Sequence, residues 1–226
     1  MTEASKIARE PGEPSPRRTR GPSPAKTAET RRAILSAALD AFLAEGFSGA
    51  RMSDVASRAG LAKGTLYLHF PDKEALFEGV VAGAIGDPLK GAMAAPPGPD
   101  EPTRAYLLRN LGPLFADLEG SRRGAVIRLV ATEGPRFPGL SAIYRRRVID
   151  PAIEAVRRLA ARALARGEIR SDALVRIPQL LIAPALMATL WNGLYGAEEP
   201  LDAGAAFAGF LDLVLGPAPD GDASAG

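Results

Sequence analysis

One stretch decides the fold of this 226-residue chain: Met52-Ser-Asp-Val-Ala-Ser-Arg-Ala-Gly-Leu-Ala-Lys-Gly-Thr-Leu-Tyr-Leu-His-Phe70. It predicts two short helices, over about 52–59 and 63–69, separated by a tight turn. Val55 and two nearby alanines give the first helix one apolar face. Gly60 then stands where a left-handed C-cap is needed to end that helix.

The second of these helices has a single apolar stripe. Leu66 and Phe70 lie one helical turn apart and form it. Gly64 and Leu68 point away from the stripe and are flanked by three polar or amphipathic side chains: Lys63, Thr65 and Tyr67. An outward face that is small, polar and basic, on a short helix after a glycine turn, suits insertion into the DNA major groove. The pattern therefore predicts a helix-turn-helix.

Helical periodicity continues on both sides of this motif, and no alternating strand pattern appears. A helix over 27–45 is expected to end at Gly46, and Asp72 is expected to cap a connecting helix over about 73–94. Five further helices are predicted, over 103–118, 122–133, 138–166, 172–196 and 202–215. The predicted fold is all-α: an N-terminal three-helix domain joined by a connecting helix to a larger helical domain.

Shifts in composition divide the chain into four parts. Residues 1–26 are rich in proline and basic residues and are expected to form a disordered arm. The helix-turn-helix domain is expected over 27–75 and the larger helical domain over 76–216. Residues 217–226 are expected to form a loose tail.

Composition restricts the class of protein. The chain has no cysteine, so disulfides and thiolate metal sites are excluded. No apolar run approaches the roughly 20 residues that span a bilayer, and residues 1–6 are not apolar like a signal segment. We expect a cytoplasmic protein with no cofactor, no metal and no membrane partner.

The placement of charge is more informative than its net value of +2. Residues 86–226 carry 16 basic and 16 acidic side chains, whereas residues 17–32 carry six basic side chains and one acidic. This excess lies directly before the helix-turn-helix, where a flexible arm can follow the phosphate backbone. A solubilising tail is the alternative.

An ordered set of residues from about 30 to 80 resembles the DNA-binding domain of the TetR family of bacterial transcription regulators. The matching elements are Arg32-Ala-Ile-Leu35, Ala38, Phe42, Gly46-Phe47, Asp54-Val-Ala56, Ala59-Gly60, Gly64-Thr-Leu-Tyr67, His69-Phe70 and Asp72-Lys-Glu-Ala-Leu76. Their order and spacing are far more specific than a bare helix-turn-helix. The chain departs from the pattern at Ala62, where the family commonly has a capping serine.

The resemblance implies roles for individual residues. Six of them match family positions that commonly touch phosphates or bases: Ser53, Lys63, Thr65, Tyr67, His69 and Lys73. Gly64 is expected to let the helix approach DNA closely, and Leu68 to pack on a thymine methyl group. For His69, a hydrogen bond at the helix end is an equally available structural role.

The larger domain is expected to bind a second copy of the chain. Residues 174–194 and 201–215 are apolar on several faces, and such helices must be buried on several sides. A twofold-related subunit supplies one such partner, and a central core within one chain is the alternative. The resemblance implies a homodimer that pairs its last two helices and binds a palindromic operator in double-stranded DNA.

A small lipophilic effector is expected between these helices, because pockets in bundles are mostly apolar. The predicted lining consists of eight side chains: Phe115, Leu118, Ile127, Val130, Tyr144, Met187, Trp191 and Tyr195. Candidate polar anchors are Arg128, Glu133, Tyr144 and Asn192. Each of these residues can equally belong to a plain core.

The predicted function is that of a ligand-responsive transcriptional repressor that binds DNA as a homodimer. One alternative is a DNA-binding regulator or architectural protein whose helical domain binds a protein. An enzyme is disfavoured, because the only histidine is His69 and the chain has no phosphate-binding loop, cysteine nucleophile or Glu-x-x-His pair.

Overall fold

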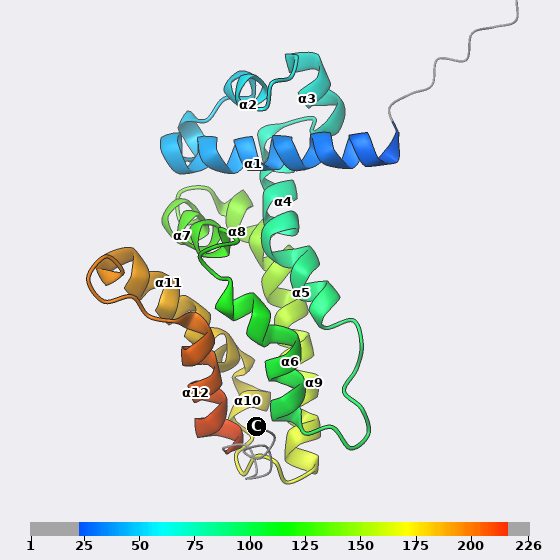
Figure 1. The fold of residues 1–226 in the computed structure, drawn as a ribbon, viewed down its shortest axis with the longest axis vertical. Coiled ribbons are helices and arrows are strands. Elements are labelled where there is room, and N and C mark those ends of the chain that lie inside the picture. Colours follow the sequence, from blue (N-terminus) through cyan, green and yellow to red (C-terminus); the bar gives the residue numbers. More distant parts are fainter. Residues whose placement is uncertain (1–22, 217–226) are drawn as a thin grey trace, which may run out of the picture.

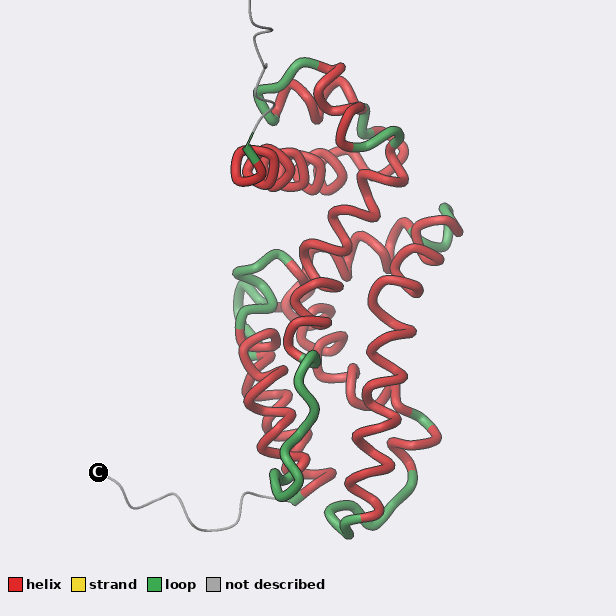
Figure 2. The backbone as a smooth tube through the Cα atoms, turned by 90° about the vertical axis from the view of Figure 1, so that its right-hand side faces the viewer, coloured by secondary structure: helices red, strands yellow, loops and turns green. Residues whose placement is uncertain are grey.

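The computed structural model describes residues 23–216, and every regular element among them is a helix (Figures 1 and 2). The upper part contains α1 (Pro24–Gly49), α2 (Met52–Arg58) and α3 (Lys63–His69). A continuous helical rod leads down from it and consists of α4 (Lys73–Val81), the π-helical segment η1 (Ala82–Gly86) and α5 (Asp87–Ala92).

The lower part begins with α6 (Thr103–Ala116) and α7 (Arg123–Glu133). A second rod follows, made of α8 (Pro138–Tyr144), the π-helical segment η2 (Arg145–Ile149) and α9 (Asp150–Ala165). The chain then forms α10 (Ala173–Arg176), the 3-10 segment η3 (Pro178–Ile182), α11 (Ala183–Tyr195) and α12 (Ala203–Leu215). The all-α prediction is confirmed for the described residues.

The first helix begins at Pro24 and is therefore longer than predicted. The Oγ of Ser23 accepts a hydrogen bond from the amide of Lys26 at 3.3 Å, and Pro24 occupies the first turn. These two residues are helix-start signals that composition alone had assigned to the arm. At the other end, Gly46 has φ 69° and interrupts the helix where it was predicted to end, and α1 resumes beyond this kink to Gly49. The arginines of the arm before Ser23, and the tail from 217, lie outside the described residues.

Three phenylalanines from two helices form the centre of the upper part. Phe42 and Phe47 of α1 and Phe77 of α4 have ring centroids 5.5–5.9 Å apart. Leu66 of α3 is fully buried in the same apolar cluster. Tilted and edge-on aromatic pairs of this kind stabilise a packing beyond their area of contact.

The turn between α2 and α3 has the predicted left-handed cap. Gly60 has φ 67°, and the amide of Leu61 donates to the carbonyl of Ala56 at 2.9 Å. This pair of features defines a Schellman end, which favours glycine because a Cβ is unfavourable at positive φ. Asp72 caps α4 as predicted, since its carboxylate accepts from the amide of Ala75 at 2.7 Å.

The buried cluster of the upper part continues below α4. Val126 and Leu129 of α7 and Leu140 of α8 belong to the same cluster as the phenylalanines. Two polar contacts join the parts as well: the Phe47 amide donates to the Glu133 carboxylate at 3.1 Å, and Arg122 pairs with Asp40 at 2.5 Å. The upper part is thus packed on α7 and α8 through α1 and α4.

Three predicted long helices are interrupted. The helix expected over 172–196 is divided into α10, η3 and α11, because Pro178 lacks the amide that an uninterrupted helix needs there. The helix expected over 138–166 contains η2, and the connecting helix contains η1.

Both π-helical segments end two residues before a proline. Pro88 follows η1 and Pro151 follows η2. A proline cannot donate to the carbonyl four residues earlier and its ring presses on that group, so the turn widens. The freed carbonyls are those of Ala84 and Arg147; the first accepts from Arg123 at 3.1 Å. η1 and η2 lie against each other, and a Cβ at Gly86 would stand 3.1 Å from the Arg147 oxygen.

The lower core is formed mainly by α6, α9 and α12. Tyr106 is fully buried and donates its hydroxyl to the Ala95 carbonyl at 2.8 Å. Phe115 and Phe207 stack with ring centroids 4.0 Å apart. Between residues 23 and 216, no helix combines the length and the apolar character that crossing a membrane requires.

Leu66 and Leu68 provide a matched test of how α3 is oriented. Leu66 is 0% exposed and Leu68 is 87% exposed on the same helix. We predict that Leu66→Ala lowers the free energy of unfolding by about 2–5 kcal/mol, because it leaves a cavity. Leu68→Ala is expected to change it by less than about 0.5 kcal/mol. Urea unfolding at one fixed protein concentration measures both; equal effects would contradict this orientation.

Candidate nucleic-acid interface and ligand pocket

The outward face of α3 is free of protein contacts where the sequence predicts it. Leu68 projects outward, Tyr67 is 42% exposed, and a Cβ at Gly64 would meet no atom within 4 Å. The Lys63 ammonium lies 5.9 Å from the centroid of the Tyr67 ring. α3 therefore presents a surface of one small, one apolar, one aromatic and one cationic residue.

The inner side of the same helix fixes its orientation. Leu66 and Phe70 are buried against α1 and α4, as the stripe predicts. The guanidinium of Arg31 lies 4.6 Å above the Phe70 ring. Thr65 and His69 are half-buried at the sides of the helix. Arg31, which was assigned no individual role from sequence, thus adds a cation beside α3.

Two other predicted contact residues have partners within the protein. The Ser53 hydroxyl donates to the Asp54 carboxylate at 3.1 Å. The Lys73 ammonium donates to the carbonyls of Ser48 and Ala50, both at 3.1 Å, and lies 4.7 Å from the Phe47 ring centroid. Lys73 therefore holds the end of α1 in place and keeps one N–H for another partner.

The start of α3 has the backbone of a capped helix without the capping side chain. Ala62 has φ −64° and ψ 143°, which is extended, and no side chain accepts a hydrogen bond there. The amide of Thr65 instead bonds to the Ala62 carbonyl at 2.9 Å. The sequence departure at this position thus removes a hydrogen bond that a serine would supply.

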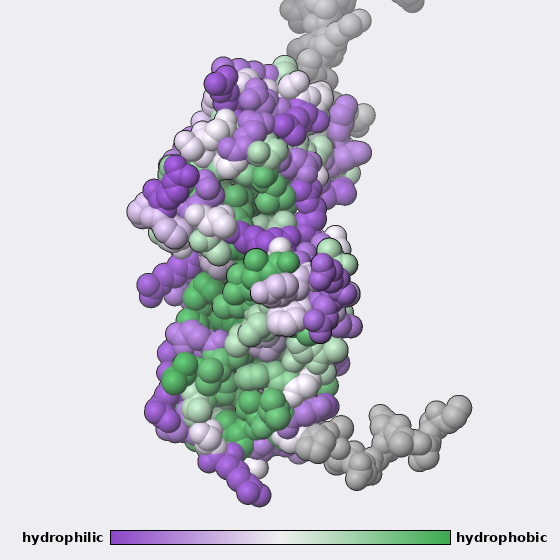
Figure 3. Space-filling model, turned by 90° about the vertical axis from the view of Figure 1, so that its left-hand side faces the viewer, coloured by the Kyte–Doolittle hydropathy of each residue, from purple (hydrophilic) through white to green (hydrophobic). Residues whose placement is uncertain are grey.

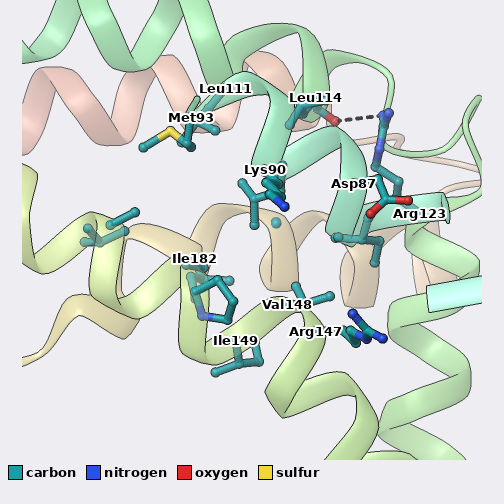
Figure 4. A pocket seen from close by; sticks show the side chains of 18 of the residues that line it. Asp87, Lys90, Met93, Leu111, Leu114, Arg123, Arg147, Val148, Ile149 and Ile182 are labelled. Atoms are coloured by element: carbon teal, nitrogen blue, oxygen red, sulfur yellow. Dashed lines mark hydrogen bonds between the residues drawn. The ribbon is translucent and has the colours of Figure 1, made fainter. Parts of the chain in front are cut away.

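A pocket of about 680 Å³ lies in the lower part, between the two rods and α6, α7 and η3 (Figure 4). Four of the eight predicted lining residues do line it: Phe115, Leu118, Ile127 and Tyr144. The wall also contains apolar side chains that sequence analysis missed: Leu89, Met93, Leu111, Leu114, Val148, Ile149, Leu181 and Ile182. Pockets of 300–1,000 Å³ with mostly apolar walls are typical of small-molecule sites.

The other four predicted lining residues do not line the pocket. Met187 and Tyr195 are more than half exposed on α11. Trp191 is turned to the chain after α11 and donates its indole N–H to the Glu199 carbonyl at 2.7 Å. Val130 packs against the upper apolar cluster. Three of these assignments relied on one helical stretch over 172–196; the break at Pro178 redirects α11 so that only its first turn, at Ala185, borders the pocket.

The candidate polar anchors also separate. Only Tyr144 reaches the pocket, and burial raises the pKa of its hydroxyl to about 12, so it stays protonated. Arg128 pairs with Glu119 at 3.3 Å, Glu133 accepts from the Phe47 amide, and Asn192 bonds in both directions to the backbone of Leu201. The last three therefore serve packing.

The pocket has charged residues that were not predicted. Five cations and one carboxylate line it: Lys90, Arg123, Arg146, Arg147, Arg158 and Asp87. Most come from the segments around Pro88 and Pro151, where the π turns bring the two rods together. The two prolines, together with the Arg145-Arg146-Arg147 run just before Pro151, are the sequence signal that could have located these charged residues.

The fold and the exposed α3 define a helix-turn-helix protein with a pocketed helical second domain. A family model described as bacterial regulatory proteins, tetR family, matches residues 34–80. A second, described as tetracyclin repressor-like, C-terminal domain, matches residues 99–208. Together they cover most of the chain, which therefore belongs to the TetR family.

Individual relatives agree with this assignment. The HTH-type transcriptional regulator RutR of Escherichia coli (strain K12) is 49% identical over 51 residues, which are 23% of this chain and 24% of RutR. The chain thus matches only about a quarter of the length of such curated relatives. A solved putative TetR-family regulator from Rhodococcus sp. is 25% identical, with a TM-score of 0.65, over 83% of this chain and 99% of that chain.

Another solved structure shares the fold at lower identity. It is the regulator FadR of Bacillus subtilis in complex with stearoyl-CoA, at 18% identity and a TM-score of 0.64. The similarity covers 83% of this chain and 99% of FadR.

The missing cap of α3 gives a test at one position. We predict that Ala62→Ser raises the free energy of unfolding by about 1 kcal/mol, because a serine Oγ in this extended backbone accepts from the Thr65 amide. Ala44→Ser, at an exposed position inside α1, is the matched control and is expected to lower it by a few tenths. Urea unfolding distinguishes the two. A gain at Ala44 or none at Ala62 contradicts the cap assignment.

Proposed function

We propose that the protein is a DNA-binding transcriptional regulator, and specifically a homodimeric repressor of the TetR type that binds a palindromic operator and responds to a small molecule. The observation that carries the proposal is the outward face of α3, where Leu68 is 87% exposed beside Tyr67 and Lys63. An apolar side chain at such a position is unfavourable in water and is well suited to a thymine methyl group.

The other residues on and around α3 fit the same role of contacting DNA. Gly64 leaves the first turn of α3 without a side chain, so backbone and duplex can approach closely. Lys63, Arg31 and the remaining N–H of Lys73 supply positive charge around the helix for phosphate contacts. Four further side chains beside α3 are proposed to form hydrogen bonds with the DNA: Ser53, Thr65, Tyr67 and His69.

A second copy of the chain is proposed to cover α11 and α12. Leu186, Leu190 and Leu194 follow one another at four-residue spacing along α11, and each is 45% or more exposed. Met187 and Leu213 extend this apolar face, which Figure 3 shows as a broad hydrophobic area on the lower part. Ridges at four-residue spacing pack into the grooves of another helix. A twofold pair would also supply two copies of α3, one for each half-site of a palindrome.

A response to a ligand requires contacts that join the pocket to the DNA-binding domain. Glu78 of α4 pairs with Arg147 at 2.6 Å and Arg146 at 2.9 Å, and both arginines line the pocket. These guanidinium groups lower the pKa of Glu78, so the carboxylate is charged at neutral pH. Through these contacts a ligand can bind more tightly to one of two positions of α4 and so favour that position. The distance between the two α3 helices of a dimer would then change.

The alternative of a protein partner in place of a small molecule is less well supported. A pocket of about 680 Å³ lies within the range of small-molecule sites, and a domain that binds only protein does not require one. FadR, which shares this fold, was solved with stearoyl-CoA, and we take this as support for a ligand with a long apolar part. Between residues 23 and 216 no three histidine or carboxylate side chains gather as a metal site, and we propose no enzymatic activity.

DNA binding is tested by selecting duplexes from a random pool and measuring affinity for the enriched sequence. We expect a palindromic site whose log affinity falls linearly with log salt, by about 0.9 per phosphate contact. Lys63→Gln is predicted to weaken binding about tenfold, because it removes a cation beside the groove. Arg157→Gln removes an equal charge on α9 and is predicted to have no effect. No enrichment, or equal losses in both variants, contradicts the assigned role of α3.

The dimer is tested by sedimentation equilibrium. We predict a dimer for the native chain and a monomer for Leu190→Glu, because a carboxylate buried in the α11 face has no partner. Leu164→Glu makes the same change at an exposed leucine on α9 and should leave the dimer intact. A native monomer, or a dimer of Leu190→Glu, would contradict the proposed interface.

A further inference from the structure

We propose that the pocket takes an amphipathic anion, a hydrocarbon body with one carboxylate or phosphate head, and that Lys90 and Arg147 hold the head. This inference rests on the proposed ligand response and specifies its chemistry. It is carried by the division of the pocket into an apolar and a charged side and by the state of each cation on its wall.

The two sides of the pocket differ in chemistry (Figure 4). Met93 and Leu111 lie together on one side, and Arg123, Asp87 and Arg147 lie on the other. The second side is adjacent to α4, since Arg147 reaches Glu78 on that helix. A bound amphiphile would thus place its hydrocarbon away from the DNA-binding domain and its head next to α4.

Two of the five cations are already committed to protein partners. Arg123 donates to the carbonyls of Ala84 and Asp117 at 3.1 and 3.2 Å and to that of Leu114 at 3.4 Å. Arg158 pairs with Glu154 at 3.1 Å. Arg123 thus joins η1 to the end of α6, and Arg158 forms an ion pair within α9, so both are engaged with the protein itself.

Lys90 is in a different state. It is exposed, it lines the pocket, and among residues 23–216 it has no ion pair and no hydrogen bond. Its three N–H donors are therefore available to an anion. A charge-assisted hydrogen bond is about twice as strong as a neutral one.

Arg147 offers a second point of attachment. Its Nε donates to Glu78, which leaves the two terminal nitrogens for a ligand. Arg146 shares the same carboxylate through one terminal nitrogen. Glu78 thus orients both guanidinium groups and also competes with any anion that enters. An anion that draws Arg147 away from Glu78 would loosen the hold of η2 on α4.

Other ligand chemistries fit less well. A cationic amphiphile would meet five positive side chains against Asp87 alone on the pocket wall. A neutral one would offer Lys90 and Arg147 no charged partner and so would forgo their charge-assisted hydrogen bonds. Tyr144 adds a protonated hydroxyl that can donate to an anionic head.

The test is calorimetric titration of the full-length protein with four compounds that share a ten-carbon chain: decanoate, decyl phosphate, 1-decanol and decyltrimethylammonium, all below micelle formation. We expect at least one of the two anions to bind about tenfold or more tightly than the alcohol and the cation. Equal or tighter binding of either comparison compound, or no binding by any of the four, would overturn the proposal.

Variants assign the head to its partners. Lys90→Gln and Arg147→Gln are each expected to weaken binding of the preferred anion about tenfold and to leave 1-decanol within twofold. Arg145→Gln is the matched control, because Arg145 belongs to the same run of three arginines but pairs with Asp150 at 3.2 Å and lies outside the pocket. Glu78→Gln is expected to raise affinity for the anion severalfold by removing its competitor.

Equal losses of both ligands in Lys90→Gln and Arg147→Gln, or a loss in Arg145→Gln as large, would contradict the assignment. Lys90 has no protein partner to lose, so Lys90→Gln should keep the fold and remain informative. The titrations contain no DNA, so their failure counts against the ligand class alone, whereas failure to select a duplex counts against the proposed function.

Discussion

The burial of Leu66 and Phe70 in the apolar cluster that also contains three phenylalanines is the interaction on which the rest of the structure depends. This burial fixes the rotation of α3 about its axis, because a helix of two turns with one apolar stripe can pack stably in only one way. Once the stripe faces this cluster, Gly64 and Leu68 must face solvent. The proposed reading surface is therefore a consequence of core packing, and it is stiff because the core behind it is dense.

Prolines have a corresponding role in the lower part. Pro88 and Pro151 each widen one helix turn, and the two widened turns meet at η1 and η2. This meeting point brings Arg146 and Arg147 to the pocket wall while both still contact Glu78 on α4. Arg146 and Arg147 thus border both the proposed ligand and α4, the helix that connects to the DNA-binding domain. They give a short physical route between the ligand and that domain.

The sequence predicted local features well and long-range ones poorly. The turn at Gly60, the cap at Asp72 and the two faces of α3 follow from periodicity and cap chemistry within a few residues, and all are present. Four of the eight residues expected around a ligand line the pocket. Met187, Trp191 and Tyr195 do not line it, because hydrophobic periodicity does not reveal where a proline redirects a helix. The cations of the pocket were missed for a related reason: the sequence of one helix does not show which of its exposed charges will border a pocket formed with a distant helix.

The claim that the outer side of α3 meets duplex bases is tested most directly by photo-crosslinking. With p-benzoylphenylalanine in place of Leu68, irradiation of the complex with the selected duplex should attach the protein to bases within the site. The same substitution at Leu43, which is exposed on α1, should give no attachment to bases. Attachment from Leu43 and none from Leu68, in a complex that still forms, would contradict the account.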